Sequence, residues 1–199
     1  MELAEEFLYA LRAAVGTDWI RTDPGSRETY GQDALGQGQL PDLVVLPENT
    51  TQVAAIIKAC AGHPVPIVPR GAGTGYTGGA VPMHGGIVVS MERMNRILEI
   101  DELNLLTVVE PNVITGDLQR AVEARGLFYP PDPASLEHSA IVGNVAECAG
   151  GPPAFKYGTT KRYVLALEAV LPTGEIVHTG SKAVKNVVGY DLTQLLVGS

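Results

Sequence analysis

The sequence of 199 residues has little cysteine, no excess of positive charge and no long apolar run. Its two cysteines, Cys60 and Cys148, are too few and too far apart for a disulfide framework or a Cys-x-x-Cys metal site, so we expect both thiols to be reduced. The 14 basic residues are outnumbered by 22 acidic ones, which leaves a net charge of -8 and no field that would attract nucleic acid or an anionic membrane. Any anion must therefore be bound locally.

No part of the sequence has the pattern of a targeting or membrane-spanning segment. Residues 1–6, MELAEE, have neither a positive region nor an uninterrupted apolar stretch. We therefore expect a cytoplasmic protein without a transmembrane segment. The four histidines, His63, His84, His138 and His178, are scattered without the spacing of metal ligands, so no metal site is predicted.

Because 45% of the residues are hydrophobic, the chain can bury a sizeable core. The spacing of its apolar residues predicts helices at 2–15, 52–60, 115–124 and 191–197, and strands at 43–46, 66–68, 87–89, 97–100, 105–109, 163–171 and 175–178. The second helix takes Thr50 or Thr51 as its N-cap, and with its two flanking strands it resembles a βαβ unit. Residues 130–158 form a long passage rich in proline and glycine.

These elements indicate an α+β protein with two halves. A weakly marked boundary lies near 101–104, which predicts an N-terminal helical segment at 1–40, a first subdomain at 41–103 and a second at 104–199. No internal repeat or low-complexity tract interrupts this division.

The segment at 69–79, PRGAGTGYTGG, contains five glycines and directly follows a predicted strand. Without Cβ atoms, such a backbone can approach a diphosphate closely and direct consecutive N–H donors at its oxygens. The hydroxyls of Thr74 and Thr77 can add donors, and Arg70 can offset the phosphate charge. The alternative is a loop whose glycines serve tight turns only.

The loop also matches G-x-G-x-x-G at Gly73, Gly75 and Gly78, the pattern of a dinucleotide-binding Rossmann fold. That fold requires the loop to open a helix whose N-terminus meets the pyrophosphate, whereas residues 80–86 lead to another strand. No suitable acidic residue follows about 20 positions later, where a ribose partner is expected. No Gly-Lys-Ser or Gly-Lys-Thr is present either, which excludes a P-loop. Backbone donors without a helix dipole fit this loop better.

Five motifs in order carry a resemblance to a known family. They are PRGAGTG at 69–75, PPDPAS at 130–135, GNVAECAGG at 143–151, KYG at 156–158 and KNVVGYDL at 185–192. The first resembles the pyrophosphate loop of the vanillyl-alcohol oxidase and p-cresol methylhydroxylase (PCMH-type) flavoproteins. The later ones resemble the glycolate oxidase and D-lactate dehydrogenase branch of that family. The likeness runs from about residue 41 to residue 199.

The resemblance implies an α+β, PCMH-type FAD-binding fold of two α+β subdomains with FAD between them. The residues expected to contact the cofactor are Pro69, Arg70, Gly71, Ala72, Gly73, Thr74, Gly75, Gly78, Gly79, Pro133, Ala134, Ser135, Gly143, Asn144, Glu147, Cys148, Ala149 and Gly150. Two plainer alternatives stay open: residues 130–133 form only a rigid connection, and Asn144 only bonds backbone in a tight turn. The family usually has paired glycines where this chain has Val142 and Gly143, which affects the local backbone path.

The activity that the resemblance implies is oxidation of a small 2-hydroxy acid, of the glycolate or D-lactate type, to the 2-oxo acid. Its expected partners are that substrate and other subunits of a glycolate oxidase-type complex, including an iron-sulfur electron acceptor. No residue matches a catalytic base. A non-catalytic FAD-binding, nucleotide-binding or subunit-interaction module is an alternative, and the missing helix after Gly79 disfavours an NAD(P) dehydrogenase.

The family continues beyond the position of Ser199 with a segment resembling EGTLGII and with a C-terminal domain that holds substrate-binding basic residues and metal-ligating histidines. We therefore expect the second subdomain to be incomplete and the fragment alone to lack turnover. A sheet without its last strands exposes an edge, which favours weak stability or self-association.

The cofactor is predicted to be bound without a covalent link. Some relatives carry a flavin-linking histidine near the end of the first loop, where this chain has Thr74. Acid precipitation of the flavin-loaded protein in detergent should therefore release the yellow chromophore into the supernatant. A pellet that stays yellow after washing contradicts the prediction.

Overall fold

The computed structural model describes residues 4–36 and 38–199, which form two compact units. Unit 1 holds the described residues up to Met94 together with Ala169–Val177, and unit 2 holds Asn95–Glu168 and His178–Ser199. The break lies earlier in the chain than the predicted one, because the strand after Met94 pairs within unit 2. The N-terminal segment predicted as a separate part belongs to unit 1.

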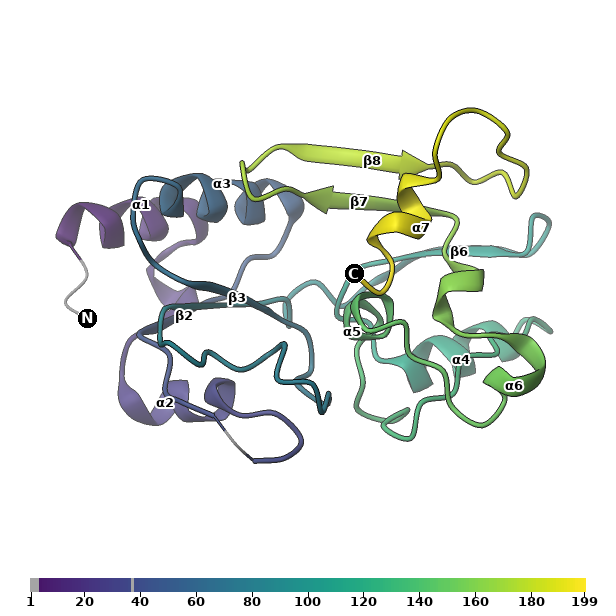
Figure 1. The fold of residues 1–199 in the computed structure, drawn as a ribbon, viewed down its shortest axis with the longest axis horizontal. Helices are drawn as coiled ribbons and strands as arrows, with labels where there is room; N and C mark the ends of the chain where they lie inside the picture. Colours follow the sequence, from purple (N-terminus) through teal and green to yellow (C-terminus); the bar gives the residue numbers. More distant parts are fainter. Residues whose placement is uncertain (1–3, 37) are drawn as a thin grey trace. The chain divides into compact units, whose positions relative to one another are not determined.

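Unit 1 is a four-stranded sheet with helices on its faces (Figure 1). Its elements are α1 (Glu5–Val15), η1 (Thr17–Trp19), β1 (Ile20–Arg21), α2 (Pro24–Glu28), η2 (Thr29–Gly31), β2 (Leu43–Val45), α3 (Thr50–Cys60), β3 (Ile67–Arg70) and β4 (Ile87–Ser90). The strand order is β1-β2-β4-β3. β4 pairs in parallel with β2 and β3, and β1 pairs antiparallel with β2. The predicted βαβ unit is present, with β4 inserted between its two strands.

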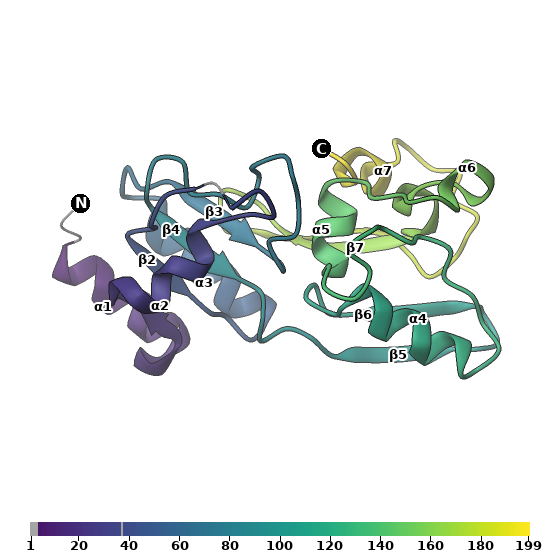
Figure 2. The ribbon, with the colours of Figure 1, turned by 90° about the horizontal axis from the view of Figure 1, so that it is seen from below.

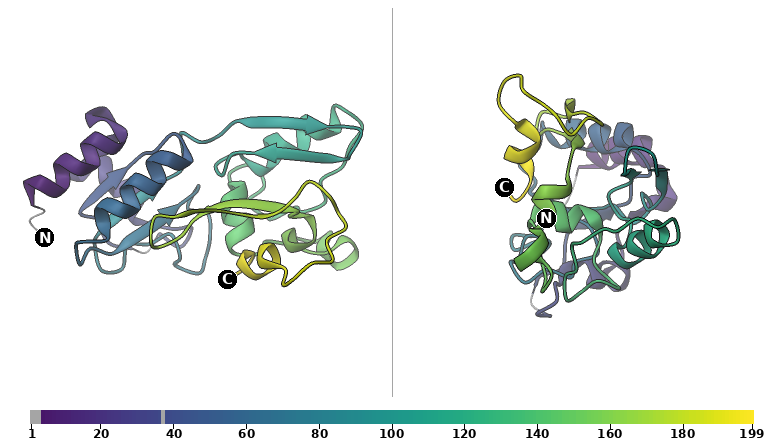
Figure 3. Two further views of the ribbon diagram at one scale, coloured as in Figure 1. Left: turned by 90° about the horizontal axis from the view of Figure 1, so that it is seen from above. Right: turned by 90° about the vertical axis from the view of Figure 1, so that its right-hand side faces the viewer.

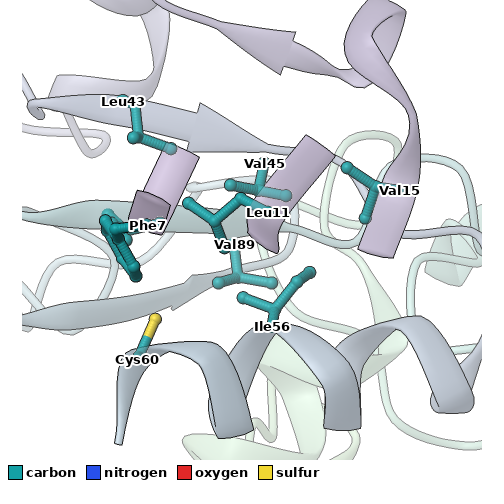
Figure 4. Close-up of a cluster of buried hydrophobic side chains, with 9 residues drawn as sticks. Phe7, Leu11, Val15, Leu43, Val45, Ile56, Cys60 and Val89 are labelled. Atoms are coloured by element: carbon teal, nitrogen blue, oxygen red, sulfur yellow. The ribbon is translucent and has the colours of Figure 1, made fainter. Parts of the chain in front are cut away.

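The two inner strands of unit 1, β2 and β4, are buried along their whole length, as expected for parallel strands covered on both faces. Figure 1 shows α1 and α3 on one side of the sheet and α2 on the other. The first core, which Figure 4 draws with all residues labelled except Ile87, contains Phe7, Leu11, Val15, Leu43, Val45, Ile56, Cys60, Ile87 and Val89. On the opposite face, Val44, Leu46 and Val88 pack with Tyr30 and Val68.

The start of α3 differs from the prediction. Asn49, rather than Thr50 or Thr51, is the N-cap, and its side-chain oxygen accepts a hydrogen bond of 2.9 Å from the backbone N–H of Gln52. Asn49 is extended while Thr50 is already helical, so only Asn49 has the geometry of a cap. The predicted start of the first helix at residues 2 and 3 lies outside the described residues.

Unit 2 contains two pairs of strands and several short helices (Figure 2). Its elements are β5 (Ile97–Asp101), β6 (Leu106–Val109), α4 (Thr115–Glu123), α5 (Ile141–Ala146), α6 (Ala154–Tyr157), η3 (Thr160–Tyr163) and α7 (Leu192–Leu196), together with those parts of β7 (Ala166–Val170) and β8 (Ile176–Gly180) that lie outside residues 169–177. β5 and β6 are antiparallel, with an irregularity between Ile97 and Glu99. The core joins α4 and α5 through Val113, Leu118, Val122 and Ile141.

The last two strands, β7 and β8, pair and run in opposite directions, as the predicted hairpin requires (Figures 1 and 3). The turn is closed by a 2.9 Å bond from the backbone N–H of Leu171 to the carbonyl of Glu175. Residues 169–177, which include the turn, belong to unit 1. None of the helices in the part of the chain that the structure describes is long and apolar enough to cross a membrane.

The stability of unit 1 is predicted to depend on the packing of α1. Leu11 is completely buried, so we expect Leu11→Ala to lower the free energy of unfolding by about 2–5 kcal/mol. Tyr9 lies on the same helix and is 73% exposed, so Tyr9→Ala should change that free energy by less than about 0.5 kcal/mol. Urea unfolding of both variants measures the difference, and equal effects contradict this packing.

Candidate functional site

The glycine-rich loop begins where β3 ends, at the carboxyl edge of the parallel strands of unit 1. This edge is where open parallel sheets bind ligands. Among the residues that the structure describes, none accepts a hydrogen bond from the backbone N–H groups of residues 71–76. The loop therefore presents a row of consecutive donors, as a backbone anion site requires.

Two glycines of the loop, Gly73 and Gly78, have left-handed φ values of +70° and +80°. A Cβ atom at Gly73 would lie 2.0 Å from Nη2 of Arg70. This position therefore requires glycine for two reasons: its left-handed φ and the close approach of the Arg70 side chain. A Cβ atom at Gly75 or Gly78 would meet no protein atom within 4 Å. Open space thus borders the loop at these two positions.

The side chain of Arg70 points into unit 1 rather than toward a ligand. It is 8% exposed, and its guanidinium donates to three backbone carbonyls. Nη1 lies 2.7 Å from the oxygen of Gln32 and 3.2 Å from that of Ala80, and Nη2 lies 3.3 Å from the oxygen of Thr29. Burial lowers the pKa of Arg70, but an arginine remains charged at neutral pH. The positive charge is therefore beneath the loop.

The hydroxyl-bearing side chains of the loop differ in their hydrogen bonds and in their exposure. Thr77 Oγ1 accepts from the backbone N–H of Gly79 at 3.4 Å, so this hydroxyl helps to close the turn. Thr74 is half-buried and Tyr76 is 70% exposed. Pro69 is exposed on β3, and the carbonyl of Gly75 accepts a 3.3 Å bond from the backbone of Ala34.

In unit 2, a backbone hydrogen bond connects the two predicted segments at 133–135 and 143–150. It is made by Asp132, which directly precedes the first segment. The backbone N–H of Asp132 donates to the carbonyl of Gly150 at 3.0 Å. A Cβ atom at Gly151, whose φ is +102°, would lie 1.7 Å from the oxygen of Asp132. The passage rich in proline and glycine is thus a closely packed pair of segments rather than only a rigid connection.

The Asn144 side chain lies in the interior of unit 2, with 3% exposure. Its Nδ2 donates to Thr115 Oγ1 at 2.6 Å, and this hydroxyl also lies 2.9 Å from the Ser139 hydroxyl. The carbonyl of Asn144 accepts from the backbone N–H of Ala149 at 2.9 Å. Asn144 therefore anchors the turn that follows α5 through its side-chain Nδ2 and its backbone carbonyl.

That turn includes Cys148, which has a left-handed φ of +50°. Its Sγ lies 3.1 Å from Thr159 Oγ1, so the thiol faces a polar neighbour. A Cβ atom at Gly143 would meet no atom within 4 Å, whereas one at Gly150 would lie 3.1 Å from Cβ of Ala154. Glu147 is exposed, and Ala149 is half-buried.

The groups that support these segments could not be recognised from the sequence. Thr29, Gln32 and Ala80 act through backbone carbonyls, and no sequence signal marks such an acceptor. Thr115 and Ser139 become partners of Asn144 only after the chain folds, since 29 residues separate Thr115 from Asn144. Within the described ranges, no group of three His, Cys, Asp or Glu side chains is arranged to hold a metal ion.

The model of a family described as an FAD binding domain matches residues 41–180, which include the loop and the turn after α5. The chain belongs to this family. FAD is its cofactor. The residues fit it, because a diphosphate requires closely spaced donors and the loop offers N–H groups that have no acceptor among the described residues and lie beside open space.

Relatives of known name support the same assignment. The chain is 53% identical over 174 residues to "Glycolate oxidase subunit GlcD" of Bacillus subtilis, covering 87% of this chain and 37% of the relative. It is 42% identical over 171 residues to "D-lactate dehydrogenase" of Anaerostipes hadrus, covering 86% and 36%. It is 37% identical over 190 residues to "D-2-hydroxyglutarate dehydrogenase" of Stutzerimonas stutzeri, covering 95% and 41%. The chain thus spans about two fifths of these relatives.

Solved structures confirm the predicted fold. Alkyldihydroxyacetonephosphate synthase superposes with a TM-score of 0.82 at 24% identity, covering 99% of this chain and 41% of that one. p-Cresol methylhydroxylase superposes with a TM-score of 0.80 at 22% identity, covering 96% and 40%. The chain therefore has the PCMH-type α+β fold.

The loop is predicted to bind FAD through its backbone at Gly75. This glycine does not have a left-handed backbone, so Gly75→Ala should leave the stability of the apoprotein unchanged. The added methyl group projects into the space beside the exposed donors, and losing one hydrogen bond to a charged group lowers affinity roughly 10- to 100-fold. Titration of the apoprotein with FAD measures this loss.

Gly62→Ala is the matched control for that substitution. Gly62 also lacks a left-handed backbone, and a Cβ atom there would meet no atom within 4 Å, but it lies outside the loop. The affinity of this variant for FAD should equal that of the unchanged protein. Equal affinities in both variants would show that the backbone at Gly75 does not contact the cofactor.

Proposed function

We propose that the chain is the FAD-binding part of a flavin-dependent oxidoreductase that oxidises a small 2-hydroxy acid, of the glycolate or D-lactate type, to the 2-oxo acid. The observation that carries the cofactor part of this proposal is the row of N–H groups at residues 71–76, which have no acceptor in the part of the chain that the structure describes. The substrate part is supported by the names of the three relatives above, since glycolate, D-lactate and D-2-hydroxyglutarate are all 2-hydroxy acids.

Each unit has a distinct task in this proposal. In unit 1, the N–H groups of the loop bind the diphosphate oxygens, and Gly75 and Gly78 allow the backbone to approach them. In unit 2, the small residues Gly143, Ala149 and Gly150 let the backbone pack closely against the flavin. Bound FAD supplies hydride acceptance, while the protein binds and orients it. No residue of the chain is assigned as a catalytic base.

The proposal also covers how FAD is attached, where the protein is located in the cell and which subunits it binds. FAD is held without a covalent bond, because the loop has Thr74 where a linking histidine stands in some relatives of the family. A cytoplasmic location is supported by the free thiols of Cys60 and Cys148 and by the acidic composition. The expected partners are other subunits of a glycolate oxidase-type complex, including an iron-sulfur electron acceptor.

A second candidate function is a subunit-interaction module that binds FAD without turnover. The observation that favours it is a run of exposed apolar side chains near the end of unit 2. These side chains are Val184, Val187, Val188, Tyr190, Leu192 and Leu195. A surface of this kind is typical of a protein interface.

Anaerobic reduction of the bound flavin distinguishes the two functions. The full-length protein loaded with FAD is mixed separately with glycolate, D-lactate and D-2-hydroxyglutarate, and the visible absorbance of oxidised flavin is followed. At least one acid should bleach this absorbance and yield its 2-oxo acid, whereas succinate, which lacks the hydroxyl group, should not. A flavin that dithionite reduces but none of the acids bleaches would contradict the oxidase proposal and favour the interaction module.

A further inference from the structure

We infer that Arg70 is the positioning residue of the diphosphate loop: its guanidinium holds the loop from inside and places a buried positive charge beneath the N–H groups of residues 71–76. The inference rests on the proposed binding of the FAD diphosphate by this loop. It assigns no direct contact between the guanidinium and a phosphate, since the side chain is directed into unit 1.

The hydrogen bonds of Arg70 connect the two ends of the loop to a distant segment. Arg70 is the last residue of β3, at the start of the loop, and its Nη1 donates at 3.2 Å to the carbonyl of Ala80, which follows the loop. Its other two acceptors are the carbonyls of Thr29 and Gln32, which lie 41 and 38 residues earlier in the chain. One planar group therefore joins three backbone segments, which suits the rigid fork of arginine.

The fold of the loop follows the shape of this guanidinium. Gly73 packs directly on it, since a Cβ atom there would lie 2.0 Å from Nη2, 2.3 Å from Cζ and 2.7 Å from Nη1. Gly73 also has the left-handed φ that turns the chain in the middle of the exposed donors. The position of Arg70 thus determines where the N–H groups of the loop point.

The guanidinium of Arg70 donates its hydrogen bonds to uncharged groups. Among the residues that the structure describes, no carboxylate forms an ion pair with it, and its three partners are carbonyl oxygens. Tyr30, Asp33 and Glu92 also act electrostatically on Arg70, and Glu92 accepts hydrogen bonds from Tyr30 at 2.9 Å and from Ser90 at 3.1 Å. A buried cation without a direct counter-ion creates a positive potential at the nearby surface, and this potential favours an anion there.

Arg27 provides a matched comparison within the same unit. It is also partly buried, and its Nη1 donates to the carbonyls of Pro41 at 2.6 Å and Asp42 at 2.5 Å. These carbonyls precede β2, at the amino end of the parallel strands, whereas the loop follows their carboxyl end. Arg27 therefore shares the structural role of a buried arginine and lacks the place beneath the loop.

The test compares Arg70→Gln and Arg70→Lys with Arg27→Gln in the full-length protein. The dissociation constant for FAD is measured by quenching of flavin fluorescence over a range of salt concentrations, and the Tm is measured without FAD. Arg70→Gln should weaken FAD binding roughly 10- to 100-fold and make its salt dependence shallower. Arg70→Lys should weaken binding less and keep the original salt dependence, because it keeps the charge but not the fork of hydrogen bonds. Arg27→Gln should lower Tm but change the affinity by less than about threefold.

Three other results would overturn the inference that Arg70 positions the loop. If Arg70→Gln and Arg27→Gln have the same effect on affinity at comparable Tm, Arg70 is only structural and the inference is wrong, while FAD binding itself stands. If Arg70→Gln does not fold, the lysine variant decides, and an affinity equal to that of the unchanged protein overturns the inference. An unchanged protein that binds no FAD overturns the proposed function, and the inference with it.

Discussion

The loop after β3 depends on one constraint: the backbone N–H groups of residues 71–76 have to be held in place although no described residue accepts a hydrogen bond from them. Unpaired donors are unfavourable when they are buried, so the surrounding structure has to hold them in place at a surface. Left-handed glycines turn the chain, and the Arg70 guanidinium fixes both ends of the loop from beneath. The parallel strands β2, β4 and β3 bring this arrangement to the edge where ligands bind.

Much of the fold could be predicted because its signals are local. The amphipathic spacing of α1 and α4 and the apolar runs of β2 and β4 are visible within a few residues, and each element forms where it was expected. Helices α5 and α6 were missed, because they are short and lie in a passage dominated by proline and glycine. The units divide at Met94, before the predicted boundary at 101–104, and the pairing of β5 with β6 is a contact that local spacing does not reveal.

The candidate site was predictable only in part, for a similar reason. Five glycines in one short segment indicate a backbone anion site, and the ordered motifs indicate the family. The direction of a side chain depends instead on partners that are distant in sequence. Arg70 turns inward because the carbonyls of Thr29 and Gln32 accept its hydrogen bonds, and Asn144 turns inward because Thr115 does. A direct cofactor contact was suggested for Arg70 by its residue type and for Asn144 by the family resemblance, whereas both side chains donate to partners within the protein.

Amide hydrogen exchange in the full-length protein tests the central claim most directly. The N–H groups of residues 71–76 have no acceptor among the described residues, so they should exchange rapidly in the apoprotein and become strongly protected when FAD is added. Exchange at Gly62, an exposed glycine outside the loop, should stay the same. Saturating FAD binding with no added protection at residues 71–76 would contradict the claim that these N–H groups hold the diphosphate.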